Sequence, residues 1–170
     1  GVYTLIVTNA GGCTDTAQVT LAVQPAPVLG ANQSETICSN TTPDLTALHT
    51  TTGLTAAWTF MGNPVINPAA VVTAGVYTLV AGSSAGCTDT AMVSLVVLQA
   101  PVLGPNQTSS FCAGNTVDLT AMYNTTGFTS AWTNTGVPVA DPTTVTASGT
   151  YMLIAISTAG CADTAMVNVT

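Results

Sequence analysis

The stretch Gly75-Val76-Tyr77-Thr78-Leu79 decides the fold, because the chain repeats it at a fixed distance. It also stands at Gly1-Val2-Tyr3-Thr4-Leu5 and, in a looser form, at Gly149-Thr150-Tyr151-Met152-Leu153. Both intervals are 74 residues (75 − 1 and 149 − 75). A fixed period of this length indicates a tandem array of small structural units.

Other landmarks keep the same period over the whole chain. Two Pro-containing linkers, Ala26-Pro27-Val28-Leu29-Gly30 and Ala100-Pro101-Val102-Leu103-Gly104, predict the domain boundaries. We expect residues 1–29 to be the C-terminal hairpin and linker of a preceding repeat, and residues 30–103 and 104–170 to be full repeats. The remaining landmarks in register are Cys13, Cys87 and Cys161; Cys38 and Cys112; Trp58 and Trp132; and Asp44 and Asp118, each followed by Leu-Thr-Ala.

Runs rich in apolar and β-branched residues predict an all-β fold. Residues 77–81 and 91–97 are two such runs, and turn-forming stretches at residues 62–64 and 83–86 separate the expected strands. Short strands with turns between them are typical of a β-sandwich. Within the first full repeat we expect strands at residues 35–38, 43–50, 54–60, 64–72, 75–82 and 87–98.

The composition excludes several classes of partner. The chain has no Lys or Arg and seven acidic residues, so its formal net charge is -7. Without cationic side chains it cannot displace the counterions of phosphates, which excludes nucleic acids and anionic lipid surfaces as partners. No apolar run approaches the roughly 20 residues that cross a bilayer, and we expect no membrane insertion. The first residues lack the features of a signal peptide, so an export signal is expected either elsewhere in a longer chain or to have been removed.

Two groups of residues carry a resemblance to a known family. Trp58, and Tyr77 at the start of a late strand, resemble the Trp and the tyrosine corner of immunoglobulin-like domains. Ile37-Cys38 and the hairpin at residues 85–91 more closely resemble the immunoglobulin-like repeats of surface adhesins secreted by Bacteroidota-type bacteria. The resemblance covers the whole chain and implies tandem immunoglobulin-like β-sandwich domains in a secreted, extracellular or cell-surface protein. Leu79 stands where antibody domains carry a disulfide cysteine, so that bridge is not expected.

The five cysteines predict disulfides within each repeat. We expect Cys38 to pair with Cys87 and Cys112 with Cys161, which leaves Cys13 for an upstream partner. A bridge enclosing about 50 residues contributes roughly 4 kcal/mol. Zinc is the alternative, but isolated cysteines without Cys-x-x-Cys spacing make a poor ligand set. Disulfides in turn imply an oxidising, extracellular compartment.

No residue pattern predicts catalysis, a cofactor or a metal ion. His49 is the single imidazole and becomes Tyr123 one period later, so we expect an ordinary surface or half-buried strand residue. A nucleophile, a base and an orienting group are not seen together. The acids are expected to cap turns and strands, and calcium between repeats stays open as an alternative. The acids are Glu35, Asp15, Asp44, Asp89, Asp118, Asp141 and Asp163.

Three threonines are candidate modification sites. Thr16, Thr90 and Thr164 each stand in an Asp-Thr-Ala sequence that resembles the O-glycosylation acceptor of the same bacterial group. In the alternative interpretation, the Asp caps the hairpin and the Thr only favours the strand. The Asn-x-Ser/Thr matches, which a Thr-rich chain produces by chance, are at Asn32, Asn40, Asn106, Asn124 and Asn168.

The repeat favours a structural role. We expect a module of an extracellular or cell-surface fibre or adhesin stalk, whose Pro-bearing linkers limit bending. The alternatives are an adhesive domain that binds a surface glycan or protein, and spacer repeats attached to a secreted enzyme. Expected partners are neighbouring repeats or copies of the chain. Strand complementation of another molecule by residues 1–22 is an alternative, and a continuous chain running upstream is the simpler interpretation. The aromatic side chains considered for glycan binding are Phe60, Phe111 and Phe128, which become Asn134, Ile37 and Leu54 in the other repeat.

Overall fold

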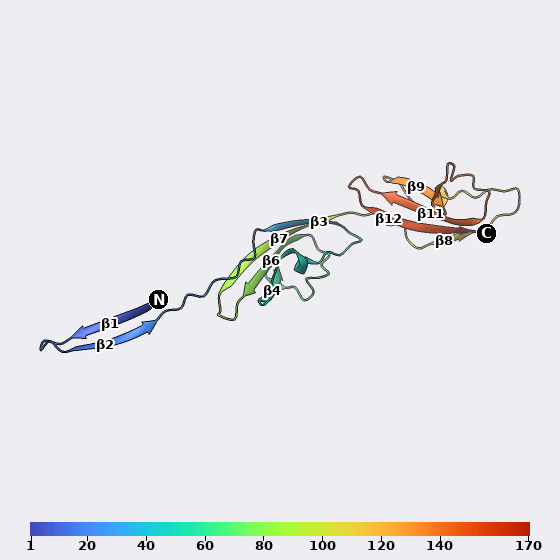
Figure 1. The fold of residues 1–170 in the computed structure, drawn as a ribbon. Helices are drawn as coiled ribbons and strands as arrows, with labels where there is room; N and C mark the ends of the chain where they lie inside the picture. The colour runs from blue at the N-terminus through green and yellow to red at the C-terminus, as the bar shows by residue number, and fades with distance from the viewer.

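The computed structural model describes residues 1–170 as an elongated row of β-structure (Figure 1). A two-stranded hairpin of β1 (Val2–Thr8) and β2 (Thr14–Thr20) precedes two five-stranded sheets. The only helical elements are the short 3-10 turns η1 (Leu45–Leu48) and η2 (Thr120–Met122). No helix in the structure has the length and apolar character that spanning a membrane requires. The predicted all-β fold of tandem immunoglobulin-like sandwiches is confirmed.

The first sheet has the strand order β3-β7-β6-β4-β5. Its edge strand β3 (Gln33–Cys38) runs parallel to β7 (Thr88–Leu98), the last strand of the repeat. The other neighbours are antiparallel: β6 (Gly75–Gly82), β4 (Thr55–Phe60) and the two-residue β5 (Asn63–Pro64). Pairing the first strand with the last brings the beginning and the end of the repeat together along one edge.

The second sheet repeats this arrangement in the order β10-β9-β11-β12-β8. Strand β8 (Gln107–Ser109) pairs in parallel with β12 (Ala162–Val169). Strand β11 (Gly149–Ile156) lies between β12 and β9 (Thr129–Asn134), and β10 (Val137–Pro138) closes the edge. The repeat of the sequence is therefore a repeat of topology.

Each sheet buries one face, as the alternation of its residues dictates. Tyr77 and Leu79 on β6 are 3% and 0% exposed. Val76, which precedes Tyr77 and so points to the opposite face, is 51% exposed. The opposite layer is formed by the linker, the 3-10 turn and an extended segment, which contribute Leu29, Leu45 and Val71. The equivalent core of the second repeat contains Leu103, Leu119, Val145, Tyr151, Leu153, Ala165 and Val167, among others.

Two of the expected strands are absent. Residues 43–50 form η1 instead, because the Asp44 carboxylate accepts hydrogen bonds from the Thr46 amide at 2.9 Å and hydroxyl at 2.6 Å, which closes a turn. Residues 64–72 continue β5 only through Pro64, and beyond it a Pro68 without an amide hydrogen cannot donate to a ladder. Pro68 instead accepts a backbone bond from Leu45 at 3.0 Å, which ties the two irregular segments together.

The tyrosine corner is present in both full repeats. The Tyr77 hydroxyl donates to the Thr73 carbonyl oxygen at 2.7 Å, and the Tyr151 hydroxyl donates to that of Ala147 at 2.9 Å. Both bonds reach back four residues, to the segment that enters the strand. They therefore pin the loop that covers the core to the strand beneath it.

The N-terminal hairpin has the same register as the β6–β7 pair. Tyr3 pairs with Val19, as Tyr77 pairs with Val93. Tyr3 is 59% exposed, whereas Tyr77 in its complete sandwich is 3% exposed. The local sequence thus specifies the hairpin, and burial of its apolar face depends on other strands.

Candidate functional site at the junction between repeats

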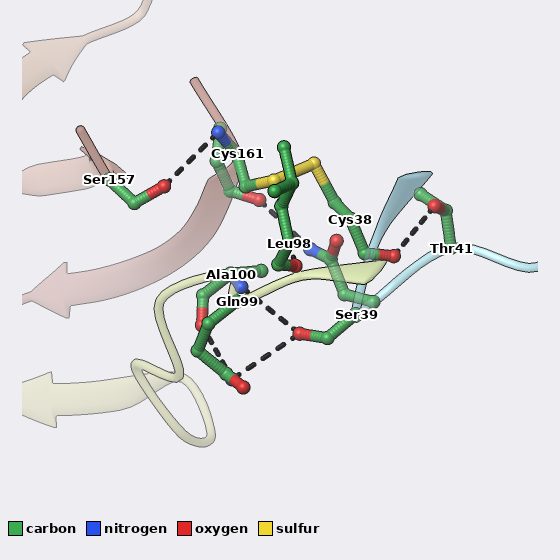
Figure 2. Close-up of a disulfide and its surroundings, with 10 residues drawn as sticks. Cys38, Ser39, Thr41, Leu98, Gln99, Ala100, Ser157 and Cys161 are labelled. Carbon is green, nitrogen blue, oxygen red and sulfur yellow. Dashed lines mark hydrogen bonds between the residues drawn. A yellow bond between two sulfur atoms is a disulfide. The ribbon is translucent and has the colours of Figure 1, made fainter. Parts of the chain in front are cut away.

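A disulfide joins the two full repeats (Figure 2). Cys38 ends β3 of the first repeat, and Cys161 lies in the turn between β11 and β12 of the second. Their Cα atoms are 5.6 Å apart, and the bridge spans 123 residues of sequence. The predicted pairs Cys38–Cys87 and Cys112–Cys161 are therefore wrong. Cys13, Cys87 and Cys112 carry no disulfide within this chain, and the upstream partner of Cys13 stays a prediction.

The parallel pairing of β3 with β7 explains the correction. Cys38 is opposite Leu98 at the end of β7, whereas Cys87 immediately precedes the beginning of that 11-residue strand. At about 3.3 Å per residue, the two cysteines lie roughly 35 Å apart. A disulfide requires Cα atoms within about 7 Å, so the two cysteines of one repeat cannot pair. Each cysteine stands at one end of its repeat.

The second repeat separates its cysteines in the same way. Cys161 directly precedes β12, and Cys112 lies beyond the other end of that strand, where the Phe111 amide donates to Thr170 at 3.1 Å. The sequence period makes Cys87 and Cys161 equivalent, so spacing alone does not distinguish a bridge within a repeat from one between repeats. Only the strand order decides between them.

Hydrogen bonds hold the linker beside the disulfide (Figure 2). The Ser39 amide donates to the Leu98 carbonyl oxygen at 2.8 Å, and the Ser39 hydroxyl oxygen accepts from the Ala100 amide at 3.0 Å. Across the junction, the Asn40 side-chain amide donates to the Ala162 carbonyl oxygen at 2.9 Å. Since Ala100 is only 2% exposed, the linker is packed into the junction and does not run free between the repeats.

An aspartate clamps the linker at the entrance to each full repeat. Asp163 accepts a hydrogen bond from the Leu103 amide at 2.8 Å, and Asp89 accepts the equivalent bond from Leu29 at 2.8 Å. The Leu29 bond, followed by the Thr90 amide, lowers the pKa of Asp89 below its ordinary value of 3.8. Each aspartate therefore connects the last hairpin of its repeat to the linker that enters it.

These contacts bear on the Asp-Thr-Ala sequences. The second carboxylate oxygen of Asp89 accepts from the Thr90 amide at 2.8 Å, and Asp163 does the same for Thr164. The aspartate therefore has a structural task in the linker clamp. Both threonine side chains are exposed, as is that of Thr16. Glycosylation of the three threonines stays a prediction.

His49 is a buried linker contact, contrary to the expectation of a surface or half-buried strand residue. It is 6% exposed, and its Nδ1 lies 2.9 Å from the Leu29 carbonyl oxygen. Its ring packs near Trp58 with 6.4 Å between centroids, as Tyr123 packs near Trp132 at 6.2 Å. Both rings have a polar atom within hydrogen-bond distance of backbone carbonyl oxygens, that of Leu29 for His49 and those of Pro105 and Met166 for Tyr123. The change from imidazole to phenol concealed that feature in the sequence.

Three further acids, Asp44, Asp118 and Asp141, cap turns. Asp118 accepts from the Thr120 amide at 2.8 Å, as Asp44 does from Thr46, and the side-chain bond from Thr120 lowers the pKa of Asp118. Asp141 accepts from the Thr143 amide at 2.9 Å and from the hydroxyls of Thr143 and Thr144, and the Thr143 hydroxyl, followed by that of Thr144, lowers the pKa of Asp141. No three His, Cys, Asp or Glu side chains gather into one cluster in the structure.

The aromatic side chains considered for ligand binding are partly buried. Phe60 stacks on Tyr77 with 4.7 Å between ring centroids, while Phe111 and Phe128 pack against the second core. An open groove lies beside the β4–β5 hairpin in the first repeat, with a volume of about 410 Å³, and an equivalent groove of about 390 Å³ lies beside β9–β10. The grooves occupy the same positions, but their chemistry differs, because Phe60 and Met61 in one correspond to Asn134 and Thr135 in the other.

No family model matches the chain, and no curated protein matches its sequence. Among solved structures, it is similar to immunoglobulin domains 1–5 of Sidekick-1, at 16% identity and a TM-score of 0.32, covering 100% of this chain and 46% of that one. It is also similar to the insect immune protein hemolin, at 13% identity and a TM-score of 0.41, covering 99% and 56%. A Bacteroides ovatus mixed-linkage glucan utilization locus protein, SGBP-B, crystallised with a mixed-linkage heptasaccharide, matches at 17% identity and a TM-score of 0.28, covering 88% and 46%. The chain thus spans less than half the length of Sidekick-1 domains 1–5.

Proposed function

We propose that the chain is a structural module of an extracellular or cell-surface fibre or adhesin stalk. The observation that carries this proposal is the Cys38–Cys161 bridge between consecutive repeats. Two covalent connections, the linker and the disulfide, join the same pair of repeats, and two connections resist bending far better than one. The bonds of Ser39 and Asp163 to the linker act in the same direction.

An oxidising environment fits this role. Disulfides persist in secreted and cell-surface proteins and are rare in the reducing cytosol. The chain also lacks Lys and Arg, so it offers trypsin-like proteases no cleavage site. His49 contacts the linker, and Cys38 and Cys161 form the bridge, so these three residues serve the junction in the proposed role.

Solution scattering tests the proposal directly. We expect residues 1–170 to give an elongated particle whose maximum dimension stays the same across salt conditions. The Cys161→Ser variant should keep both folded repeats and show a broader distribution of particle lengths, because only the linker then joins them. Cys13→Ser, which removes an unbridged thiol, is the matched control. A compact particle with the repeats folded side by side would overturn the proposal.

Ligand binding at the grooves is a second candidate function. It is favoured by the recurrence of a groove at equivalent positions in both repeats. The first-repeat groove is the more apolar, with Phe60, Val65 and Val71 among its lining residues. A surface glycan or a protein segment bound there should be lost on Met61→Asp, because the change places a charge on an 82% exposed side chain at the groove. Glycan-array binding that Met61→Asp leaves intact would argue against this site.

Glycosylation of the exposed threonines belongs to the same proposal. Glycans at Thr16, Thr90 and Thr164 would help to solubilise a chain that is only 4% charged. Intact-mass measurement of the native protein should show discrete added masses that disappear one by one in Thr→Val variants. A native mass equal to that of the bare chain would exclude the modification.

A further inference from the structure

The turn that holds Cys87 is built like the turn that holds the bridged Cys161. The Cys87 amide donates to the Ser83 hydroxyl oxygen at 3.3 Å, as Cys161 does to Ser157 at 3.2 Å. In both turns the serine amide donates back to the cysteine carbonyl oxygen at 2.8 Å. The Cys87 environment is thus that of a cysteine already seen in a disulfide.

The sulfur of Cys87 also faces the same part of the linker. Its Sγ lies 3.9 Å from the Gln24 carbonyl oxygen, and the Sγ of Cys161 lies 3.8 Å from that of Leu98, one period later. Leu98 is the residue opposite Cys38, the bridging partner. A partner for Cys87 would accordingly end a strand that pairs in parallel beside residues 19–24.

Cys112 reproduces the other half of the bridge. It lies one period after Cys38, and the turn that follows is the same, because the Asn115 amide donates to the Cys112 carbonyl oxygen at 3.0 Å as Thr41 does to Cys38 at 2.9 Å. Cys112 is exposed at the end of the second repeat. Its place in the second repeat is the one that Cys38 has in the first, where Cys38 bonds the hairpin turn of the next repeat.

We propose that Cys87 and Cys112 each form a disulfide with a neighbouring repeat, of the same kind as the Cys38–Cys161 bridge. Cys87 pairs with the strand-end cysteine of a preceding repeat, and Cys112 pairs with the hairpin-turn cysteine of a following one. This inference rests on the proposed function, because it requires further repeats of the same kind. It explains why each repeat carries two cysteines at opposite ends: each end bridges one neighbour, and the head-to-tail contact propagates along the array.

The second junction would depend more on its disulfide than the first. Ser39 and Asn40, whose side chains bond the linker and the neighbouring hairpin, correspond to Ala113 and Gly114 beside Cys112. Neither Ala nor Gly has a side-chain donor or acceptor. The bridge from Cys112 therefore has to hold its hairpin without those two side-chain contacts.

Bridge formation needs an oxidant, which we assign to the class of thiol–disulfide oxidoreductases in their disulfide form. The thiolate of Cys112 attacks one oxidant sulfur, forms a mixed disulfide and releases one oxidant thiolate. The thiolate of the partner cysteine then attacks the Cys112 sulfur and releases the second oxidant thiolate. The two cysteines lose two protons and two electrons, and the oxidant disulfide becomes a dithiol.

Peptide mapping of the native full-length protein tests the proposal. After free thiols are blocked, non-reducing digestion with pepsin and an Asp-specific protease should yield the Cys38–Cys161 pair. It should also yield the Cys87 peptide linked to a peptide that contains a strand-end cysteine equivalent to Cys38. The Cys112 peptide should be linked to one that contains a hairpin-turn cysteine equivalent to Cys161. Blocked, unpaired Cys87 and Cys112, or a Cys38–Cys87 pair, would overturn it. Denaturing electrophoresis with and without reductant then shows whether the partner repeat belongs to the same polypeptide or to a second copy.

A variant separates this inference from the proposed function. In the native array, Cys112→Ser should release one partner cysteine as a newly reactive thiol per molecule, whereas Ser110→Ala, two residues away and exposed, should release none. No new thiol in Cys112→Ser would contradict the bridge. If the protein is nevertheless an elongated rod, only the inference fails; a compact particle would instead remove the proposed function.

Discussion

The two full repeats agree at the aspartate and asparagine residues that bond the linker and the last strand, and they differ at several exposed positions. Asp89 and Asp163 accept the same linker bond, and Asn32 and Asn106 each accept an amide bond at 2.9 Å from the last strand. By contrast, Ile66 is 98% exposed in the first repeat and corresponds to Ala140 in the second. Three further exposed apolar side chains have polar counterparts, and these pairs are Met61 and Thr135, Val72 and Thr146, and Val76 and Thr150.

This difference separates two kinds of position. Asp89 and Leu79 belong to the first kind, because their counterparts Asp163 and Leu153 make the same linker bond and fill the same core position. The exposed residues belong to the second kind. They have no such partner, so a position can be apolar in one repeat and polar in the next. The following experiments alter positions of the first kind, in order of decreasing expected effect.

The largest effect should come from Cys161→Ser. The chain-entropy model assigns roughly 5 kcal/mol to a bridge that closes about 120 residues, so the variant should unfold at a markedly lower denaturant concentration. Its two repeats should also unfold separately, because the second covalent connection is gone. Denaturant unfolding followed by Trp fluorescence checks both effects. Identical curves for the variant and the Cys13→Ser control would refute the expectation.

Leu79→Ala and Leu153→Ala compare the two cores. Both side chains are 0% exposed, and truncating such a leucine costs about 3 kcal/mol through lost burial and the cavity left behind. We expect nearly equal losses in the free energy of unfolding, each confined to its own repeat. Leu5→Ala is the control, since Leu5 is the equivalent residue but 62% exposed. Unequal losses would mean that the two cores are packed differently.

Tyr77→Phe and Tyr151→Phe remove the tyrosine-corner hydroxyl from one repeat at a time. Each change leaves a backbone carbonyl oxygen, that of Thr73 or Ala147, without its donor and should cost about 1 kcal/mol. Calorimetry of the two variants should give matching decreases in melting temperature. If only one of the two variants melts at a lower temperature, the corner bond of the other repeat does not contribute to stability.

The smallest effect concerns the linker clamp at low pH. Because its folded pKa lies below the ordinary 3.8, Asp89 stabilises the folded state at pH values above 3.8, and this contribution is lost as the pH falls through the folded pKa. The melting temperature of the wild-type chain should therefore approach that of Asp89→Asn as the pH is lowered from 5 to 2. A constant difference over that range would show that the Asp89 charge does not contribute.

The strands and their repeat were predictable from the sequence because both depend on local pattern. β4, β6 and β7 lie within one residue of the runs that predicted them, and β3 begins two residues before its expected start. The error at residues 43–50 arose because a single Asp44 side chain diverts the backbone into a turn, and an apolar run does not reveal this. The burial of His49 was missed for a similar reason, since its linker partner Leu29 is 20 residues away.

The sequence by itself determined that the chain is a β-sheet array with a period of 74 residues and two cysteines in each full repeat. It could not determine which cysteines pair, because a shift by one period exchanges Cys87 for Cys161 without changing their local sequence. Only the tertiary structure decided this point. The parallel pairing of β3 with β7 carries Cys38 to the far end of its repeat, out of reach of Cys87 and against the hairpin of the next repeat.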